Sequence, residues 1–423
     1  MSLKNSKTQD FFSTTESEVT SINLHLHLMH RKMAPSLLSN SSLYLESSSA
    51  DPVQIISTKQ DVQQSYQQYQ KPVRRIVKRE GPHYKWDIVW KNVLIFILLH
   101  GFGIYGLYIM FVKAQWRTIL FGYLYAATSA MGVTAGAHRL WAHRTYKAKL
   151  PLRIFLMICQ SAALQNDLHE WVRDHRVHHK FTDTDADPHN SRRGFFFSHI
   201  GWLMVKKHKD VFSKGKTVDL SDIESDPVVM FQKRHYVLMV TFLCFMIPAH
   251  IPWYFWGEDW WVSWYVTIAR YTLSLHFTWL VNSAAHIWGT KPYDKTINPV
   301  ENKFVAWVAF GEGWHNYHHI FPWDYKAAEL GDYRLNPSTA FLDLMAYFGL
   351  AYDLKTVSED MVRKRVKRTG DGTWKNKNDN AGASMGNESD DHHHGEGVWG
   401  WGDKDMEEED IKDVRVFNEL KED

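Results

Sequence analysis

Long uncharged stretches alternate with polar ones along this chain of 423 residues. Residues 92–112 and 118–137 are each uncharged and mostly apolar. About 20 such residues in an α-helix cross the hydrocarbon core of a bilayer. Only the short link Lys113–Arg117 separates the two stretches, so we expect two membrane helices that form a hairpin.

A second pair of apolar stretches follows later in the chain. Residues 236–255 contain Pro248 and Pro252 near their end, and residues 260–288 are interrupted by a single charge, at Arg270. At about 1.5 Å per residue the last helix would be roughly 43 Å long, more than the hydrocarbon core requires. We therefore expect a second hairpin, whose last helix projects from the membrane in its C-terminal half.

The polar segments decide how these helices are oriented. Residues 150–164 are apolar, but the stretch is short and contains Arg153, so we expect an interfacial or core helix there instead of a span. Four spans then place both termini and residues 138–235 on one side, opposite the loop with Glu258 and Asp259. Basic residues mark the first side as cytosolic; they are Arg74, Arg75, Lys78, Arg79, Arg192, Arg193, Lys206 and Lys207.

The two ends of the chain have a different composition from its middle. Residues 1–80 are rich in Ser, Gln and charge, and we expect a disordered cytosolic extension. Residues 81–360 contain all four expected spans. Residues 361–423 are polar and acidic, with EEED at 407–410, and we expect a second disordered tail.

The charge and cysteine content narrow the classes of function. Lys and Arg number 49 against 47 Asp and Glu, a formal charge of +2 that is too balanced to indicate a nucleic-acid partner. Cys159 and Cys244 lie in apolar stretches, so we expect buried thiols in a reducing compartment, with no disulfide framework. The 24 histidines are many for this length and need an explanation of their own.

Three histidine clusters follow the expected hairpins. They read HRLWAH, HRVHH and HNYHH, and one further histidine lies near the end of the fourth apolar stretch. An even number of spans separates the clusters, so all of them lie on the same side of the membrane. The nine candidates are His138, His143, His175, His178, His179, His286, His315, His318 and His319. The run HHH at 392–394 lies in the acidic tail and is interpreted as low-complexity sequence.

The spacing of these histidines points to metal binding. On a helix, the first His of HxxHH lies one turn from the other two, so one face presents three imidazoles. Neutral imidazole binds Zn, Cu and Fe. A single zinc is satisfied by about four ligands, whereas nine histidines suit two metal ions. The Glu-x-x-His pattern of carboxylate-bridged bundles is absent from all three clusters. The sequence therefore predicts an all-α membrane protein with four transmembrane helices in two hairpins and a cytosolic helical cap that carries a histidine-rich dinuclear metal site.

The clusters and their surroundings resemble a known family. HRLWAH, DHRVHH, NSAAH and GEGWHNYHHIFPWDY are similar to the signature boxes of animal acyl-CoA desaturases of the stearoyl-CoA desaturase group. The resemblance extends from about Trp86 to Leu354, and TAGAHRLWAH and FGEGWHNYHH read most like the insect members. It implies an enzyme of the endoplasmic reticulum membrane, with both termini cytosolic. It also implies two Fe²⁺ ions, O2 as co-substrate, and electrons from cytochrome b5 and its NADH-dependent reductase.

The resemblance assigns roles to individual residues. It makes the nine histidines the iron ligands, with Asn282 joining them through a water. It gives the CoA head group the candidates Asn92, Asn166, Arg173, Asp174, Lys206 and Lys207. The two lysines replace an Arg-Lys pair of the family, which keeps the charge but loses one fork-shaped donor. A membrane-surface anchor is the alternative role for them.

The remaining assignments concern a tunnel for the acyl chain. Its bend is expected at Gln165, Trp171, Thr278 and Trp279. Ala126 and Ala130 lie one turn apart on the second span and are candidates for its closed end. A small residue in a membrane helix is more often a packing contact, so that alternative stays open.

The function expected from these patterns is the desaturation of a long-chain saturated acyl-CoA, by default at Δ9. Removing two hydrogens from unactivated methylenes requires an oxidant made from O2 at a metal, while the protein supplies placement and a dry tunnel. A histidine-box hydroxylase needs the same metals and membrane and is the first alternative. A non-enzymatic metal carrier is the second, but it would place its ligands within the spans near the bilayer midplane. All the candidate histidines except His286 lie outside the apolar stretches.

Overall fold

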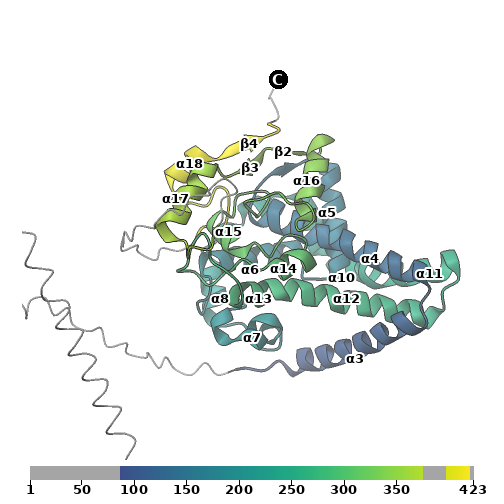
Figure 1. Ribbon diagram of the computed structural model, residues 1–423. Helices are drawn as coiled ribbons and strands as arrows, with labels where there is room; N and C mark the ends of the chain where they lie inside the picture. The colour runs from purple at the N-terminus through teal and green to yellow at the C-terminus, as the bar shows by residue number, and fades with distance from the viewer. Residues whose placement is uncertain (1–85, 375–396, 420–423) are drawn as a thin grey trace, which may run out of the picture. The chain divides into compact units, whose positions relative to one another are not determined.

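The computed structural model describes residues 86–374 and 397–419 (Figure 1). The chain divides into two units, Met1–Pro82 and His83–Asp423, and the described residues belong to the second. The expected N-terminal extension, residues 1–80, lies outside them. The described part is helical, as the sequence predicted, with a few very short strands.

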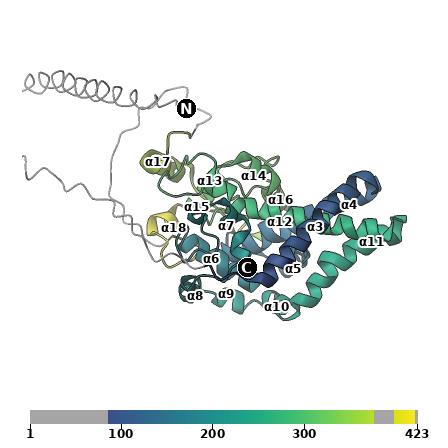
Figure 2. The same ribbon diagram turned by 90° about the horizontal axis from the view of Figure 1, so that it is seen from below.

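The first two long helices follow the first apolar pair of the sequence. Helix α3 spans Trp90–Val112, and α4 spans Trp116–Met131 and continues as a π-helical segment, Gly132–Ala142. Helix α3 packs closely on α12 (Trp260–Asn282) because it presents glycine there. A Cβ atom at Gly106 would lie 2.3 Å from the carbonyl oxygen of Tyr265. Both figures show these helices extending together away from the shorter ones (Figures 1 and 2).

The third long helix begins earlier than the sequence predicted. It runs without interruption from Pro227 to Trp256 as α10 (Pro227–Val240), a π-helical segment (Thr241–Met246) and α11 (Ile247–Trp256). Its start at Pro227 is explained by the side chain of Asp226, which accepts hydrogen bonds from Val228 N and Val229 N. The expected start at residue 236 was wrong because charged residues in the first turns of a helix do not end it.

The π-helical segment of this helix explains how the charged side chain of Arg270 is accommodated among apolar residues. A π-bulge releases backbone carbonyls from the regular helical pattern. The carbonyl of Cys244 accepts from the Arg270 guanidinium at 2.8 Å, and that of Leu243 accepts from the Tyr125 hydroxyl. Arg270 is thereby buried between α11, α4 and α12, with the aromatic ring of Tyr125 5.2 Å from its guanidinium carbon.

Among the described residues, three helices are long and apolar enough to cross a membrane: Trp90–Val112, Trp116–Ala142 and Pro227–Trp256. Helix α12 has 23 residues, but it carries several polar side chains and is not one of the three. The helix expected to run on to residue 288 ends at Asn282. Ser283 interrupts it, and a short helix α13 (Ala284–Ile287) follows. Leu150–Ala163 forms the apolar helix α5, which at 14 residues is shorter than a span.

Short elements near the ends of the long helices carry most of the predicted histidines. Two antiparallel pairs tie them together: β1 (Lys147–Ala148) with β2 (Ala351–Tyr352), and β3 (Leu354–Thr356) with β4 (Arg415–Phe417). The short helices are α6 (Leu168–Lys180), α7 (Phe195–His199), α8 (Lys209–Gly215), α9 (Ser221–Glu224), α14 (Lys303–Val308), α15 (His315–Ile320), α16 (Pro337–Tyr347), α17 (Glu359–Thr369) and α18 (Glu408–Asp413). Single 3₁₀ turns lie at Ser191–Arg193 and Gly201–Leu203.

The C-terminal part of the chain corrects the prediction of a disordered tail from residue 361. Helix α17 buries Val362 and Val366, and residues 397–419 fold against the helices that carry the histidines. Trp399 and Met406 are buried there at 2% and 8% exposure. A few large apolar side chains suffice to anchor this segment, and its acidic average composition concealed them. Residues 375–396 lie outside the described part.

Candidate metal centre

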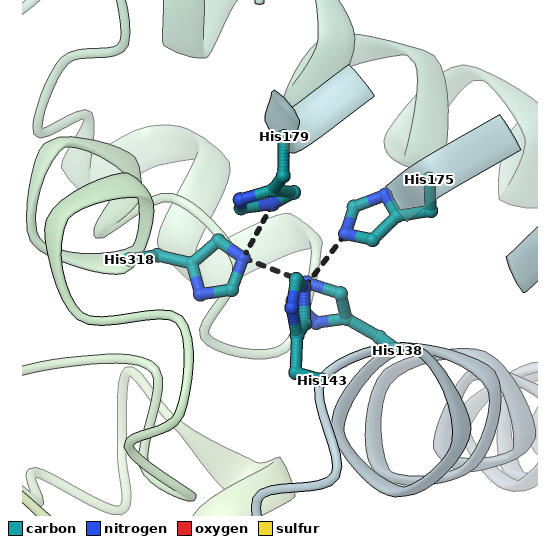
Figure 3. Close-up of side chains that lie close together, drawn as sticks. All are labelled: His138, His143, His175, His179 and His318. Carbon is teal, nitrogen blue, oxygen red and sulfur yellow. Dashed lines mark hydrogen bonds between the residues drawn. The ribbon is translucent and has the colours of Figure 1, made fainter. Parts of the chain in front are cut away.

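The structure brings all nine predicted histidines together in two groups, within each of which one ring nitrogen per residue lies within 4.8 Å of the others. The five-histidine group contains His138, His143, His175, His179 and His318. The four-histidine group contains His178, His286, His315 and His319. Figure 3 shows the rings of the first group converging from three parts of the chain.

Helical geometry divides each HxxHH cluster between the two groups. In α6, His175 and His179 are four residues apart and face the five-histidine group, while His178 faces the other. Helix α15 does the reverse, since His315 and His319 face the four-histidine group and His318 the five-histidine group. The two helices therefore each contribute to both groups. The prediction that one face presents all three imidazoles holds only broadly, because positions i+3 and i+4 lie on opposite sides of position i.

A π-helical turn places the first cluster. His138 lies in the segment Gly132–Ala142, and His143 caps that segment with its N–H on the carbonyl of His138, at 3.0 Å. A bond across five residues defines a π-turn, a rare form that occurs frequently at functional sites. It puts both rings on the same side, with centroids 4.7 Å apart.

The inward nitrogen atoms of these rings face one another. In the five-histidine group, His318 Nε2 lies 2.9 Å from His138 Nε2 and 3.1 Å from His179 Nε2. His143 Nε2 lies 2.8 Å from His175 Nε2. In the four-histidine group, His315 Nε2 lies 3.1 Å from the Nε2 atoms of both His286 and His319.

Acceptors on the outside indicate which ring nitrogen carries the proton. His138 Nδ1 lies 2.9 Å from a Glu312 oxygen, and His178 Nδ1 lies 3.0 Å from an Asp187 oxygen. His143 Nδ1 hydrogen-bonds to the carbonyl oxygen of Trp399. A neutral imidazole has one N–H, so a donor at Nδ1 leaves a bare lone pair at Nε2. Lone pairs this close repel each other, and cations between them relieve the repulsion. The donor set therefore fits metal ions, with outer acceptors of the kind that orient ligating histidines.

Burial keeps six of the nine imidazoles neutral. Desolvation, followed by the neighbouring histidines, holds six pKa values well below the ordinary 6.5; they belong to His143, His175, His179, His315, His318 and His319. Neutral imidazole is the form that ligates a metal. Burial opposes ionisation of Glu312, but Arg139 and His138 outweigh it and lower the pKa of that carboxyl. The site thus combines neutral ligands with an ionised carboxylate outside them.

Sequence reasoning missed the outer partners of the histidines. Asp187 faces His178, and Asp183 Oδ2 lies 3.5 Å from His286 Nδ1. Both belong to the motif DTDADPHN just after the second cluster, and Glu312 lies three residues before the third cluster. That proximity was a usable signal, because carboxylates commonly orient metal-ligating histidines. No comparable signal marked the carbonyl of Trp399.

A cavity of about 320 Å³ extends from the histidines between α4 and α12. It begins at His138, His175 and His178 and reaches Met110 and Tyr123 at its other end. It is lined mainly by apolar side chains, so it suits an extended hydrocarbon chain.

Most residues predicted for the tunnel line this cavity. Ala126 and Ala130 line it from α4, and Trp171 stacks on His175 with ring centroids 4.8 Å apart. Gln165, in the loop after α5, donates through Nε2 to Thr278 Oγ1 on α12 at 2.9 Å. Asn282 lines the cavity as well, half-buried at the end of α12.

Trp279 does not lie among the lining residues of the cavity. It is 4% exposed and packs against Phe96 and His199, with ring centroids 5.8 and 5.7 Å apart. Because one residue on an α-helix corresponds to a rotation of about 100°, Trp279 points away from the side on which Thr278 lines the cavity. Its assignment to the tunnel bend stays a prediction.

The head-group candidates fall into two sets. Arg173 and Lys207 are brought together by the carboxylates of Glu170 and Asp174, with Arg173 Nη2 at 2.7 Å from Asp174 Oδ1 and Lys207 Nζ at 3.1 Å from Glu170 Oε1.

The other three candidates lie apart from this charged cluster. Asn92 uses its side-chain amide to donate to Leu203 O at 2.8 Å. Asn166 and Lys206 are exposed, and Lys206 Nζ lies 3.7 Å from Asp87.

The fold and the site together define a class of protein, in which apolar helices support a buried histidine site suited to metal ions. The chain matches the family model described as fatty acid desaturase over residues 114–335. It is 58% identical over 297 residues to an acyl-CoA Delta-9 desaturase of Acheta domesticus and 60% identical over 297 residues to an acyl-CoA Delta12-desaturase of the same organism. Each of these matches covers 70% of this chain and 83% of the relative. Stearoyl-CoA desaturase 5 of Bos taurus is 55% identical over 291 residues, 69% of this chain and 86% of that protein. This chain belongs to the fatty acid desaturase family.

Proposed function

We propose that this chain is an acyl-CoA desaturase that introduces a double bond into a long-chain acyl-CoA, with O2 as co-substrate. The observation that carries the proposal is the pair of histidine groups at the head of an apolar cavity. Family membership and relatives named as acyl-CoA desaturases support the same oxidoreductase chemistry. The prediction made from the sequence motifs is confirmed at this level.

Two iron ions are the proposed cofactors, one for each histidine group. Imidazole nitrogens facing inward and carboxylates outside suit ions that prefer nitrogen ligands. When bound, the iron supplies the activation of O2 needed to break C–H bonds of unactivated methylenes. We assign Asn282 to a water-mediated contact, since it lines the cavity near His315. The protein holds the ligands neutral and excludes bulk water from the reacting carbons.

The proposed substrate lies with its acyl chain in the cavity and its CoA outside. The hydrogen-bonded pair Gln165 and Thr278, together with Trp171, lies along the cavity wall near the histidines and would set the bend of the chain. Arg173 and Lys207 would bind CoA phosphates, in competition with the carboxylates that hold them now. Ala126 and Ala130 would border the end of the chain.

The position of the double bond is proposed as Δ9 on a saturated chain. The Delta-9 relative and the stearoyl-CoA desaturase favour it. The Delta12 relative of similar identity favours a second candidate, a double bond at carbon 12. The two candidates differ only in which carbons of the chain lie beside the histidines.

The proposal also includes the cellular setting. Helix α12, 23 residues long, would be the fourth span. Four spans would put both termini on one side, which we propose to be the cytosolic side of the endoplasmic reticulum membrane. The basic flanks of the apolar stretches support this orientation. Cytochrome b5 and its NADH-dependent reductase would supply the electrons from the cytosolic side, where the histidine groups would lie.

Expression in a desaturase-deficient yeast tests the function. Cells supplied with saturated chains should accumulate a product lighter by two hydrogens with its double bond at carbon 9. A product heavier by one oxygen would identify a hydroxylase instead. A double bond at carbon 12 would favour the Delta12 candidate. Loss of the product in the His178→Ala and His318→Ala variants ties the reaction to the site.

A further inference from the structure

A segment far from the histidine clusters in sequence lies directly against the five-histidine group. We call residues 397–406 the C-terminal segment. The Trp399 carbonyl accepts the hydrogen bond of His143 Nδ1, and Trp401 N donates to the carbonyl of His143 at 2.9 Å. Gly397 N donates to the carbonyl of Lys180, the residue after His179, at 3.0 Å. Both the side chain and the backbone of His143 are therefore held by this segment.

Close backbone contact requires glycine at two positions of the segment. A Cβ atom at Gly400, where φ is +153°, would lie 2.5 Å from His143 O and 2.6 Å from its Cα. A Cβ atom at Gly397 would lie 2.3 Å from His179 O. Contacts under 3 Å with backbone atoms cannot relax by a side-chain rotation. The segment is thus fitted to the backbone of two histidines of the five-histidine group.

Side chains fix the segment in this position. The Trp399 ring lies 4.0 Å from the Arg176 guanidinium carbon and is buried with Val177 and Phe181. Asp403 accepts a hydrogen bond from Trp399 N at 2.9 Å and pairs with Lys180 at 3.1 Å. Lys180 and Asp403 side chains are only 3% and 1% exposed, and Lys180 also pairs with Asp405 of the same segment. A buried ammonium group needs such partners, so Lys180 holds the segment in place.

The contacts of the segment are unequal between the two histidine groups. Its hydrogen bond to an imidazole goes to His143, in the five-histidine group. In the four-histidine group, His178 and His286 instead face Asp187 and Asp183, which do not belong to the C-terminal segment. A disturbance of the C-terminal segment should therefore act on one group first.

We propose that the C-terminal segment is a working part of the metal centre. Trp399 is a positioning residue, because its carbonyl holds His143 as the Nδ1–H tautomer and leaves Nε2 free to ligate the metal of the five-histidine group. The inference rests on the proposed metal-binding function and goes beyond it. It assigns a role in metal affinity to a region whose composition is that of an acidic tail.

Two glycine variants of the full-length chain provide a matched test. Gly400→Ala drives a methyl group into the His143 backbone. Gly402→Ala also places alanine at a positive φ, +82°, but its nearest neighbour is the flexible end of Arg144 at 3.3 Å. The measurements are iron per chain in the membrane-extracted protein and the Mössbauer spectrum of ⁵⁷Fe-loaded enzyme. Losses of orienting partners commonly weaken metal binding by about 10–100-fold.

The expected result is selective. Gly400→Ala should lower iron from about two to about one per chain, remove one of two spectral components, and abolish turnover. Gly402→Ala should keep both components. Two outcomes would overturn the inference. In one, the Gly400→Ala variant keeps both spectral components and full turnover. In the other, a folded Gly400→Ala variant loses both spectral components equally.

A milder variant tests the proposal if the Gly400→Ala protein does not accumulate in membranes. Asp403→Asn keeps the shape of the Asp403 side chain but removes its charge, which weakens the hold on the C-terminal segment. The protein should then release one iron to a chelator at least ten-fold faster. An unchanged rate of iron release would contradict the proposal.

The wild-type chain separates this inference from the proposed function. If the wild-type protein neither binds iron nor desaturates acyl chains, the proposed function is wrong. If the wild-type protein is active and the variants behave like it, only the role of the C-terminal segment is wrong.

Discussion

The backbone N–H of His143 donates to the carbonyl oxygen of His138 at 3.0 Å, across five residues. This π-turn brings two imidazoles onto one side of a helix end, where α-helical geometry would separate residues five apart by more than a quarter turn. His143 is then held from the other direction by the carbonyl of Trp399. One ligand candidate therefore depends on both the second apolar helix and the C-terminal segment.

Removing one histidine from each group should have distinguishable effects. His318→Ala should lose the metal of the five-histidine group, and His178→Ala that of the four-histidine group, since the two residues belong to different groups. Each variant should fall from about two irons per chain to about one and lose desaturation by orders of magnitude. Iron analysis and Mössbauer spectra of the purified variants check this. Identical residual spectra would contradict the division into two groups.

Truncation at the two ends of the chain should give opposite results. Removing residues 1–80 should preserve turnover, because none of the candidate ligands lies there. Removing residues 397–423 should abolish turnover and lower the iron content, because Trp399 and Met406 are buried against the helices of the site. Activity per folded chain in microsomes is the measurement. An equally active C-terminal truncation would contradict a role of this region in the site.

The sequence contained the ligands but not their arrangement. Histidine spacing, together with the place of His286 near the end of the fourth apolar stretch, identified all nine residues of the two groups. Their division into two groups depends on how α6 and α15 face each other, which local spacing does not encode. The break at Ser283, which separates His286 from α12, occurs without a proline or glycine that would predict it. The contact between His143 and Trp399 joins residues 256 positions apart, and a single sequence carries no signal for such a pairing.

Acid should destabilise the metal-free protein in a defined window. Six buried histidines have lowered pKa values: His143, His175, His179, His315, His318 and His319. Below about pH 6.5 the unfolded chain binds protons at these positions that the folded chain does not, so the free energy of unfolding falls as pH falls. The lowered carboxyl pKa values of Asp187 and Glu312 act only below about pH 4.5, where carboxyls of the unfolded chain become protonated.

Between about pH 6.5 and 5 the histidines dominate this dependence. Burial raises the carboxyl pKa of Glu301 to about 8 and that of Asp410 to about 6, which opposes the decrease, but the six histidines outnumber these two carboxyls. Thermal unfolding of chelator-treated protein in detergent should show a Tm that decreases across this pH range. His319→Gln should show a shallower decrease, because it removes one group that the fold keeps unprotonated. A Tm that stays constant or rises on acidification would contradict the assignment of neutral, buried imidazoles.

Bulk at Ala126 should shorten the longest acyl chain that fits. Ala126 lines the cavity on α4, so Ala126→Tyr places a ring in space that the end of the chain would occupy. Each excluded methylene forfeits about 0.8 kcal/mol of burial, and two of them shift the preference between chains two carbons apart by roughly ten-fold. The double bond should stay at the same distance from the thioester, because the histidine groups do not move.

Leu124→Tyr is the matched control for this variant. Leu124 lies on the same helix but is 54% exposed, so a ring there meets the surroundings of the helix and leaves the cavity unchanged. Competition between two saturated acyl-CoAs of different length measures the preference directly. A packing role for Ala126 predicts less enzyme with an unchanged ratio of products, whereas a border of the tunnel predicts a changed ratio with Ala126→Tyr alone. If both tyrosine variants shift the ratio equally, the cavity between α4 and α12 does not hold the end of the acyl chain.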